Sequence, residues 1–510
     1  MFKMRIFQGI INLKSFDMKK SLIFCAGALC ILIASCSKDS AYDPEMDSSL
    51  SLDKARHLQA PVIVLPPSGD GDDTDEMLAA IASAEPGTVI QLLEGEYFTG
   101  IMEVYDFHGS LIGAGEGKTI ITLKAPISIN SQSAKNQVSS WWRLIDGDIV
   151  ISGMTFRTPD GFPTEDVDPF TGRDIYSMFM INNYNDTYYH PYDSHQNVSF
   201  INTGFIGGTN TDMSQDAYWV TDHNIWLAIW IGVDYMWPAE GVDYPLTAGC
   251  YKIRGCSFEH FLDAVEGFSL GEEATIEVSG CKMNTCMTPL YFTANFNSSI
   301  LIANNQFMNS TVTDITLEDA DWGFLMNTTI EPIRRCQYNV YGNHFNDMPG
   351  VSSIVCNDYS VILYPEARLP MMINVKGNTF NMGGGGTAIA ANNSQDAQIR
   401  NNRFIGNADR GVYLDGMMVY DVWTGEPVGM GTAENGLILG NNFTGLNTTE
   451  AHIVMGESSL NCTVVGNGKD NVIDLGTDNK IVGMNKMSGG NHAGPAIRDN
   501  FRMMPKMRGH

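Results

Sequence analysis

The stretch NNRFIGN (residues 401–407) decides the fold of this chain, because close copies of it recur in the second half. The other copies are NNQFMNS (304–310), GNHFNDM (342–348), GNTFNMG (377–383) and GNNFTGL (440–446). Asn tolerates the left-handed backbone that a sharp turn between strands requires. Repeated coil after coil, its amide can hydrogen-bond in a ladder while the Phe rings stack inward. The motif therefore predicts architecture and argues against a catalytic site.

The spacing of the motif indicates a coil of constant size. The apolar residue two positions after the asparagine or cysteine marks the phase of each turn, with CSF (256–258) and CKM (281–283) as the first two. The successive markers are Phe258, Met283, Phe307, Phe345, Phe380, Phe404 and Phe443. The intervals between them are 25, 24, 38, 35, 24 and 39 residues. Loops inserted between regular turns explain the longer intervals. A short fixed period is the signature of a solenoid.

The runs between the markers exclude helical repeats. ATIEVSG (274–280), SSILIAN (298–304) and MMINVKG (371–377) alternate with period two and end in Gly or Asn, as short strands bounded by turns do. The pattern resembles the right-handed parallel β-helix of the pectate-lyase-like superfamily over most of residues 85–485. The resemblance implies an all-β solenoid, and we predict a single such domain over residues 61–490.

A short helix is expected just before the first coil. Asp73 and Glu76 have the spacing of a capping box. The residues that then share one helical face are Met77, Leu78, Ile81 and Ala84. An amphipathic helix at this position would plug the open end of the stack, whose terminal coil would otherwise expose core and sheet edge.

Composition describes a folded chain with a large core. The 510 residues are 44% hydrophobic and 17% charged, and 51 are glycines, as a turn-rich β protein requires. The formal net charge of −27 repels phosphate. It therefore argues against nucleic acid or an anionic membrane surface as a partner.

The N-terminus resembles a bacterial lipoprotein signal peptide. Met18-Lys19-Lys20 precedes an apolar run, residues 22–34, that is too short for a permanent transmembrane helix. The run ends in the lipobox-like Ile33-Ala34-Ser35-Cys36, so residues 1–35 would be the signal peptide and Cys36 the lipidated residue. Residues 36–60 form a polar tether, and Cys36-Ser37-Lys38-Asp39 loosely resembles the export signal of Bacteroidetes surface lipoproteins. We expect a monomer that is lipid-anchored in the outer membrane and exposed at the cell surface.

Seven cysteines remain beyond the signal region, and this odd number leaves at least one thiol unpaired within the chain. The absence of a CxxC pair gives a zinc or redox site no support. Cys256 and Cys281 share one phase, two residues before successive markers. We expect them to stack as small buried residues; a Cys250–Cys256 bridge is the alternative.

The repeat breaks at about residues 157–250, which we predict to be a large loop insertion. Residues 158–250 hold thirteen Asp or Glu, one Arg and no Lys. Carboxylates beside flat aromatic rings suit carbohydrate, because a sugar ring stacks on an indole while its hydroxyls bond to the acids. The alternative is that the aromatic residues form the core of a subdomain. The expected substrate-binding residues are Trp219, Trp226, Trp230, Trp237, Tyr188 and Tyr189.

Candidate catalytic groups lie in and just after this segment. They are Asp216, Asp222 and His223 in the loop, and Asp263 and Glu266 in the strand FLDAVEGFS (261–269). Glu266 alternates with Val265 and is expected to point outward. The alternatives are an exposed turn for Asp222 and His223, and a solvated outer face for Asp263 and Glu266.

The C-terminal run, residues 491–510, is basic, and we expect it to be either a cap or a loose tail.

Two enzyme chemistries fit the family resemblance. A polysaccharide lyase needs cations beside a uronate, and this segment supplies one Arg and no Lys, unless its acids hold calcium. A glycosidase needs two carboxylates, which are abundant. Asn210-Thr211-Asp212 matches one polygalacturonase-like motif, but the other motifs are missing, so that mechanism is not carried over. We predict an enzyme acting on polysaccharide, with hydrolase favoured over lyase; the alternative is a non-catalytic glycan-binding or adhesin-like surface protein.

Overall fold

The computed structural model divides the chain into two compact units, Met1–Gln59 and Ala60–His510. All residues it describes lie in the second unit. They are residues 60–69, 71–124, 140–159, 177–182, 196–208, 227–232, 249–268, 274–293, 298–318, 336–359, 362, 371–420, 426–467 and 471–483. The expected signal peptide, Cys36, the tether and the basic C-terminal run lie outside them. None of the described helices is both long and apolar enough to span a membrane.

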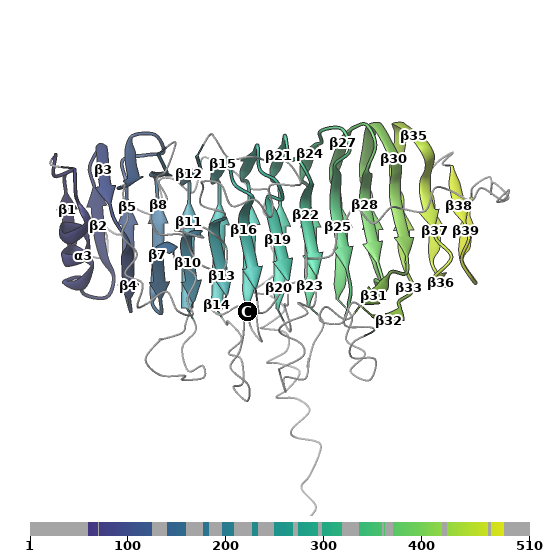
Figure 1. The fold of residues 1–510 in the computed structure, drawn as a ribbon, viewed down its shortest axis with the longest axis horizontal. Coiled ribbons are helices and arrows are strands. Elements are labelled where there is room, and N and C mark those ends of the chain that lie inside the picture. The colour runs from purple at the N-terminus through teal and green to yellow at the C-terminus, as the bar shows by residue number, and fades with distance from the viewer. Residues whose placement is uncertain are drawn as a thin grey trace, which may run out of the picture. The chain divides into compact units, whose positions relative to one another are not determined.

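Parallel strands stack coil upon coil, so the predicted right-handed parallel β-helix is confirmed (Figure 1). Each regular coil contributes three strands, and each strand pairs with its counterpart in the next coil. We name the three resulting stacks ladder 1, ladder 2 and ladder 3, in the order in which the chain visits them. Ladder 1 is a separate 14-stranded sheet, whereas ladders 2 and 3 join into one 21-stranded sheet.

The strand bounds follow the three ladders. Ladder 1 contains β1 (Val62–Leu65), β2 (Thr88–Leu92), β5 (Gly109–Ile112), β8 (Asp148–Ser152), β11 (Gln196–Ile201), β14 (Gly249–Arg254), β17 (Thr275–Ser279), β20 (Ser299–Ala303), β23 (Gln337–Tyr341), β26 (Met372–Lys376), β29 (Gln398–Arg400), β34 (Leu437–Leu439), β37 (Thr463–Val465) and β39 (Lys480–Val482). Ladder 2 contains β3 (Gly95–Thr99), β6 (Thr119–Leu123), β9 (Thr155–Arg157), β12 (Gly204–Ile206), β15 (Ser257–Glu259), β18 (Lys282–Asn284), β21 (Gln306–Met308), β24 (His344–Asn346) and β27 (Thr379–Gly383). Ladder 3 contains β4 (Met102–Tyr105), β7 (Ser140–Ile145), β10 (Ser177–Asn182), β13 (Leu227–Gly232), β16 (Asp263–Phe268), β19 (Leu290–Thr293), β22 (Thr313–Glu318), β25 (Ser352–Asn357), β28 (Thr387–Asn392) and β38 (Val472–Asp474).

Two long strands join ladders 2 and 3, and two small sheets complete the fold. The joining strands are β30 (Arg403–Asp415) and β35 (Asn442–Met455). An antiparallel hairpin pairs β31 (Met418–Tyr420) with β32 (Pro427–Met430), and a short parallel pair joins β33 (Ala433–Glu434) to β36 (Ser459–Leu460).

The phase markers form one stack inside the coils. Phe258 pairs with Met283, Met283 with Phe307, and Phe307 with Phe345. The ring centroids of successive phenylalanines lie 4.8 Å (Phe307–Phe345), 4.7 Å (Phe345–Phe380), 4.8 Å (Phe380–Phe404) and 4.4 Å (Phe404–Phe443) apart, with nearly parallel planes. The marker spacing read from the sequence therefore gives the true register.

The first two residues of each motif have separate structural roles. The first, such as Asn401 at φ 54°, takes the left-handed conformation, and glycine replaces it in other copies. The second is buried and belongs to an asparagine ladder. Asn402 Nδ2 donates to the Val375 carbonyl (2.9 Å) and to Asn441 Oδ1 (3.0 Å), and the Asn402 backbone N–H donates to the same Oδ1 (2.9 Å). The ladder runs through Asn305, Asn343, Asn378, Asn402, Asn441 and Asn467.

The predicted helix before the first coil is present, but its N-terminal residue makes other hydrogen bonds than predicted. α3 (Thr74–Ala82) buries Met77, Ala80 and Ile81 against the first coils, as the apolar pattern predicts. The capping box is wrong, because Asp73 is the N-cap yet makes no side-chain hydrogen bond to the helix. Its carboxylate instead accepts from the backbone N–H of Ser68 (2.6 Å) and of Phe98 (2.8 Å), which ties the helix start to β3.

The cysteines beyond the signal region are all free, and most are buried. Cys256 and Cys281 are 1% and 0% exposed and occupy the place that asparagine takes in later coils. The backbone N–H of Cys281 donates to Asn305 Oδ1 (2.9 Å), where the asparagine ladder begins. The stacked buried pair is confirmed, and Cys250 and Cys256 form no bridge.

The coil continues through the segment that sequence analysis treats as a loop insertion. β10, β11, β12 and β13 lie within residues 157–250 and belong to the three ladders. Phe205 is the missing marker, because it pairs with Phe156 on one side and Phe258 on the other. Thr203 replaces the ladder asparagine here, which is why the motif vanishes while the coil does not. The segment consists of coils with long connections, and those connections are mostly outside the described residues.

Candidate functional site

The outer face of ladder 3, the side that points away from the core, is the best candidate for a functional surface. Long connections flank its strands at both ends in the coils of β10 and β13, and one follows β22 and another β25. Loops positioned by a rigid scaffold are where binding and catalytic groups concentrate. The core cluster shows which residues reach this face: Ile229 and Ile231 belong to it, whereas Trp230 between them does not, and Glu266 is the Cα partner of Trp230.

One row of outward residues crosses the middle of this face. Its members are Cα partners on successive strands, and we call them the central row: Trp230, Glu266, Tyr291, Thr316 and Val355. The register thus brings together two residues that sequence analysis selects, Trp230 and Glu266. Tyr291 on β19 lies directly beside Glu266.

Asp263 begins the same strand, β16, three residues before Glu266. Asp263 pairs with Leu227 on β13, while the register of Glu266 leads through Tyr291 to Thr316. Asp263 and Glu266 are 2% and 7% exposed, so the alternative of a solvated outer face is wrong.

Glu318, a residue not among the candidates from the sequence, accepts three side-chain hydrogen bonds on this face. Its Oε2 accepts from the Tyr291 hydroxyl (2.9 Å), and its Oε1 accepts from Asn357 Nδ2 (3.1 Å) and the Tyr359 hydroxyl (3.3 Å). The side chain is half-buried at the end of β22. The same signal that singles out FLDAVEGFS was available in TDITLE (313–318), a strand with acids interrupting its apolar alternation.

A second row, which we call the end row, carries Glu318 onward along the face. Its Cα partners are Glu318, Asn357, Asn392 and Asp415. Asn392 Nδ2 donates to Asn357 Oδ1 (2.9 Å), and the Tyr413 hydroxyl donates to Asp415 Oδ2 (2.6 Å). Burial raises the pKa of Tyr413, and its bond to the Asp415 carboxylate raises it further. The row offers carboxylates and amides, and its tyrosine partners add phenols, the groups that bind sugar hydroxyls.

The spacing of the carboxylates suits chemistry on a glycosidic bond. β19 lies between β16 and β22, and adjacent strands are about 4.8 Å apart. Glu266 and Glu318 therefore lie on strands about 10 Å apart, with Tyr291 between them. Two carboxylates that flank a scissile bond are about 5–9.5 Å apart, which two long glutamate side chains can reach from these strands.

Trp230 is placed differently from the expectation of a sugar-stacking surface. Its side chain is 2% exposed, and its ring meets Phe268 edge-on with centroids 6.4 Å apart. That is the packing role given above as the alternative. Asp216, Asp222, His223, Trp219, Trp226, Trp237, Tyr188 and Tyr189 lie outside the described residues.

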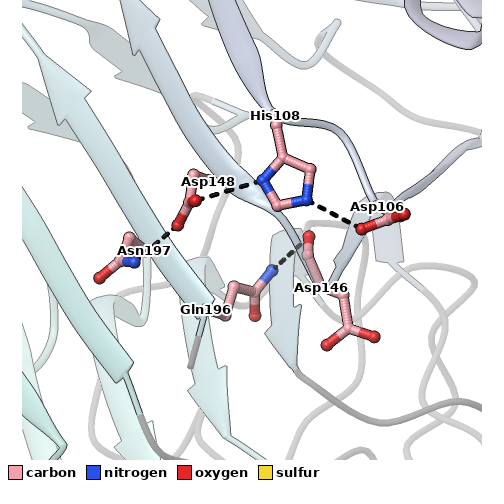
Figure 2. Close-up of polar contacts among 6 residues, drawn as sticks. All are labelled: Asp106, His108, Asp146, Asp148, Gln196 and Asn197. Atoms are coloured by element: carbon pink, nitrogen blue, oxygen red, sulfur yellow. Dashed lines mark hydrogen bonds and ion pairs between the residues drawn. The ribbon is translucent and has the colours of Figure 1, made fainter. Parts of the chain in front are cut away.

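A polar cluster around His108 lies apart from these rows, at the corner between ladders 3 and 1 (Figure 2). His108 lies between Asp106 (Nε2 to Oδ1 3.0 Å) and Asp148 (Nδ1 to Oδ2 3.2 Å), and Asn197 Nδ2 donates to Asp148 (2.6 Å). Partial burial lowers the pKa of His108, but the hydrogen bonds and charges of the two carboxylates raise it above its usual value. The imidazole is 40% exposed. The cluster ties three successive coils together.

No group of three or more His, Cys, Asp or Glu side chains able to hold a metal ion occurs among the described residues. The described part of the chain therefore offers no built calcium site. The acidic connections between residues 158 and 250 are where sequence analysis places that option.

No family model matches the chain, and no curated protein matches it. Solved structures do. Polygalacturonase from Erwinia carotovora ssp. carotovora is 10% identical over 84% of this chain and 96% of its own, with a TM-score of 0.44. The A-module of the Azotobacter vinelandii mannuronan C-5 epimerase AlgE6 is 13% identical over 83% and 98%, with a TM-score of 0.38. A GH87 alpha-1,3-glucanase catalytic domain bound to tetrasaccharides is 12% identical over 80% and 69%, with a TM-score of 0.41. At these values none of them assigns a substrate or reaction to this chain.

Proposed function

We propose that this protein acts on a polysaccharide along the outer face of ladder 3 and hydrolyses a glycosidic bond there. The observation that carries the proposal is the arrangement of Glu266, Tyr291 and Glu318 on three consecutive strands. It sets two carboxylates on either side of a tyrosine, in different surroundings. Environments that separate the roles of two carboxylates are the usual basis of acid and base assignments.

The surroundings suggest which carboxylate does what. Glu318 accepts three hydrogen bonds, and such bonds stabilise the ionised form. It would act as the base or nucleophile. Glu266 is buried, and burial disfavours the charged form of a carboxylate. Glu266 would hold a proton and protonate the leaving oxygen.

Hydrolysis fits the charges better than elimination does. A lyase needs a cation beside the uronate carboxylate, and ladder 3 offers Arg143 in line with the central row and Arg410 farther along. Arg410 is occupied by Glu450, which accepts from its Nε (2.5 Å), and by stacking on the Tyr413 ring at 4.6 Å. Residues 158–250 add one further arginine and no lysine.

Binding without catalysis is the second candidate, and one observation favours it. Glu318 is already occupied by three protein donors, and Asp263 and Glu266 are both buried. A face in which every acid is engaged would hold a glycan without cleaving it.

A panel of polysaccharides separates these candidates. The purified domain, residues 60–510, is incubated with each polymer, and reducing ends, unsaturated products and retention are measured. New reducing ends without unsaturated product would support the hydrolase, and unsaturated product would show a lyase. Retention of a polymer that stays intact would reject the enzyme in favour of glycan binding.

We also propose that Cys36 is lipidated and anchors the protein in the outer membrane. The supporting observation is that an apolar run at the N-terminus ends in Ile33-Ala34-Ser35-Cys36. Metabolic labelling with a palmitate analogue tests this. Label should enter the wild type and be lost in Cys36→Ala, and equal labelling of both would refute the anchor.

A further inference from the structure

Two acidic side chains lie inside the coil, where the other neighbours are apolar or small. Asp314 is on β22 next to the core residue Ile315, and Asp347 follows β24 in the next coil. They are 1% and 8% exposed. In register, the place of Asp314 is taken by Ser353 one coil later and by Ala388 one coil beyond that. Small residues at this position leave room for the acidic pair.

Each carboxyl group has one oxygen bonded to a serine and one that is not. The Ser310 hydroxyl donates to Asp314 Oδ1 (2.6 Å), and the Ser353 hydroxyl donates to Asp347 Oδ2 (2.5 Å). The other two oxygens, Asp314 Oδ2 and Asp347 Oδ1, are buried and have no donor. Ser353, which donates to Asp347, lies opposite Asp314 in the register of β22 and β25, so the two carboxyl groups approach each other inside the coil. When both groups are ionised, Asp314 Oδ2 and Asp347 Oδ1 can only accept hydrogen bonds. A proton on one of the two groups supplies the missing donor.

We propose that Asp314 and Asp347 form a proton-binding site inside the β-helix, in which one proton is shared between their carboxyl groups. In this state Asp314 is the acid that donates and Asp347 the carboxylate that accepts. Two buried like charges in contact would repel each other, and a single proton removes one of them.

The charges around the pair agree with this assignment. Burial raises the pKa of Asp314 well above its usual value, and the charge and hydrogen bond of Asp347 raise it further. Burial also raises the pKa of Asp347, although bonds from Asp314 and Ser353 counteract part of that rise. The groups that act on the pair are the two acids themselves, Ser310, which precedes β22, and Ser353 on β25. No Lys, Arg or His among the described residues contributes to either pKa.

The protonation of this pair makes the stability of the fold depend on pH in one direction. A carboxyl group whose pKa is higher in the folded state gives its full stabilisation below the unfolded value of about 3.9. That stabilisation is lost as the pH rises through the folded value. The domain should therefore lose stability from mildly acidic toward alkaline pH through this pair.

Asp314→Asn is the decisive variant, because its amide N–H can donate to Asp347 without a titrating proton. Thermal unfolding of residues 60–510 is followed from pH 4 to pH 9 in EDTA, with Asp75→Asn as a control for loss of one exposed carboxylate. The Tm of Asp314→Asn minus that of the wild type should rise by about 1–3 °C per pH unit until the pair ionises. A difference that is flat across this range would overturn the proposal.

Infrared spectroscopy provides a readout that does not depend on the variant folding. Glu266→Gln at neutral pH, which removes the other carboxyl group proposed to hold a proton, should still show the carbonyl stretch of a protonated carboxylic acid seen in the wild type, and this band should lose intensity in Asp314→Asn and Asp347→Asn. Absence of this band in the wild type or in Glu266→Gln would overturn the proposal. So would a rise in the wild-type Tm on adding calcium that Asp314→Asn does not share, since the pair would then be a cation site.

Discussion

Asn401 and Asn402 are adjacent, identical in chemistry and different in function. Asn401 supplies a left-handed backbone at the turn, which glycine supplies in three other copies of the motif. Asn402 is buried and makes three hydrogen bonds across the coils. The pair offers a controlled test of the ladder within two residues.

We expect Asn402→Ala to destabilise the domain by about 1–3 kcal/mol, because it leaves the Val375 carbonyl and Asn441 without their donors. Asn401→Gly should change the free energy of unfolding by less than about 0.5 kcal/mol, because glycine adopts the same conformation. Urea denaturation measures both. Equal losses in the two variants would show that the ladder bonds contribute nothing of their own.

Phe404 tests the aromatic stack. It is fully buried, with Phe380 and Phe443 at 4.8 and 4.4 Å. Phe404→Ala should cost about 3–5 kcal/mol, while Phe404→Leu should cost less because most of the volume remains. Glycan retention by the folded variants should be unchanged. A change in specificity without loss of stability would move this residue from the core to the site.

His108 should make stability depend on pH near neutrality. Its pKa is raised in the folded state, so its contribution is full below about 6.5 and is lost as the pH rises through the folded value. Because the group is exposed, the effect should stay below about 1 kcal/mol. His108→Gln should abolish this part of the stability profile between pH 6 and pH 9. An unchanged profile in the variant would refute the assignment.

At the scale of elements, coils were predictable wherever their turns repeated one motif. Markers from Phe258 to Phe443 gave the correct register because each is an inward residue bounded by a turn. The coil of Phe205 was missed because Thr203 stands where later coils have asparagine, as Met154 does in the coil of Phe156. An apolar or hydroxyl side chain can fill that place without the ladder, so the coil persists without its signature.

The candidate site was partly predictable for the same reason. Glu266 stood out because a charge interrupts an apolar strand. Glu318 obeys the same rule, but its partners Tyr291, Asn357 and Tyr359 come from three other places in the sequence, and only the register brings them to it. The capping box failed because Asp73 bonds to β3 across the coil, which spacing within the helix cannot reveal.

Asp73 also provides a test at this scale. Asp73→Ala removes the acceptor for the N–H groups of Ser68 and Phe98, so the first coils should open more often. Amide hydrogen exchange should accelerate in β1, α3 and β3 and stay unchanged in β17–β27, because coils contact mainly their neighbours. Uniform acceleration throughout the stack would show that the domain opens as a single unit.

At the scale of the whole molecule, the stack of coils is a scaffold and one face of it carries the chemistry. The core and the asparagine ladder repeat, whereas the outer face of ladder 3 changes from strand to strand. There Glu266 stands between Trp230 and Tyr291, and the position of Glu318 is taken by Asn357, Asn392 and Asp415 in the coils that follow. Function on this account follows from which side chains each coil presents outward, and stability follows from those it presents inward.

The central claim is that Glu266 and Glu318 act together on a glycan. The most direct measurement is kcat on whichever polymer the panel identifies, for Glu266→Gln and Glu318→Gln, with the exposed Glu94→Gln as the matched control. We predict a loss in kcat of about 100-fold or more for each of the first two with little change in KM, and none for the control. Wild-type kcat in both Glu266→Gln and Glu318→Gln, with the fold intact, would contradict the account.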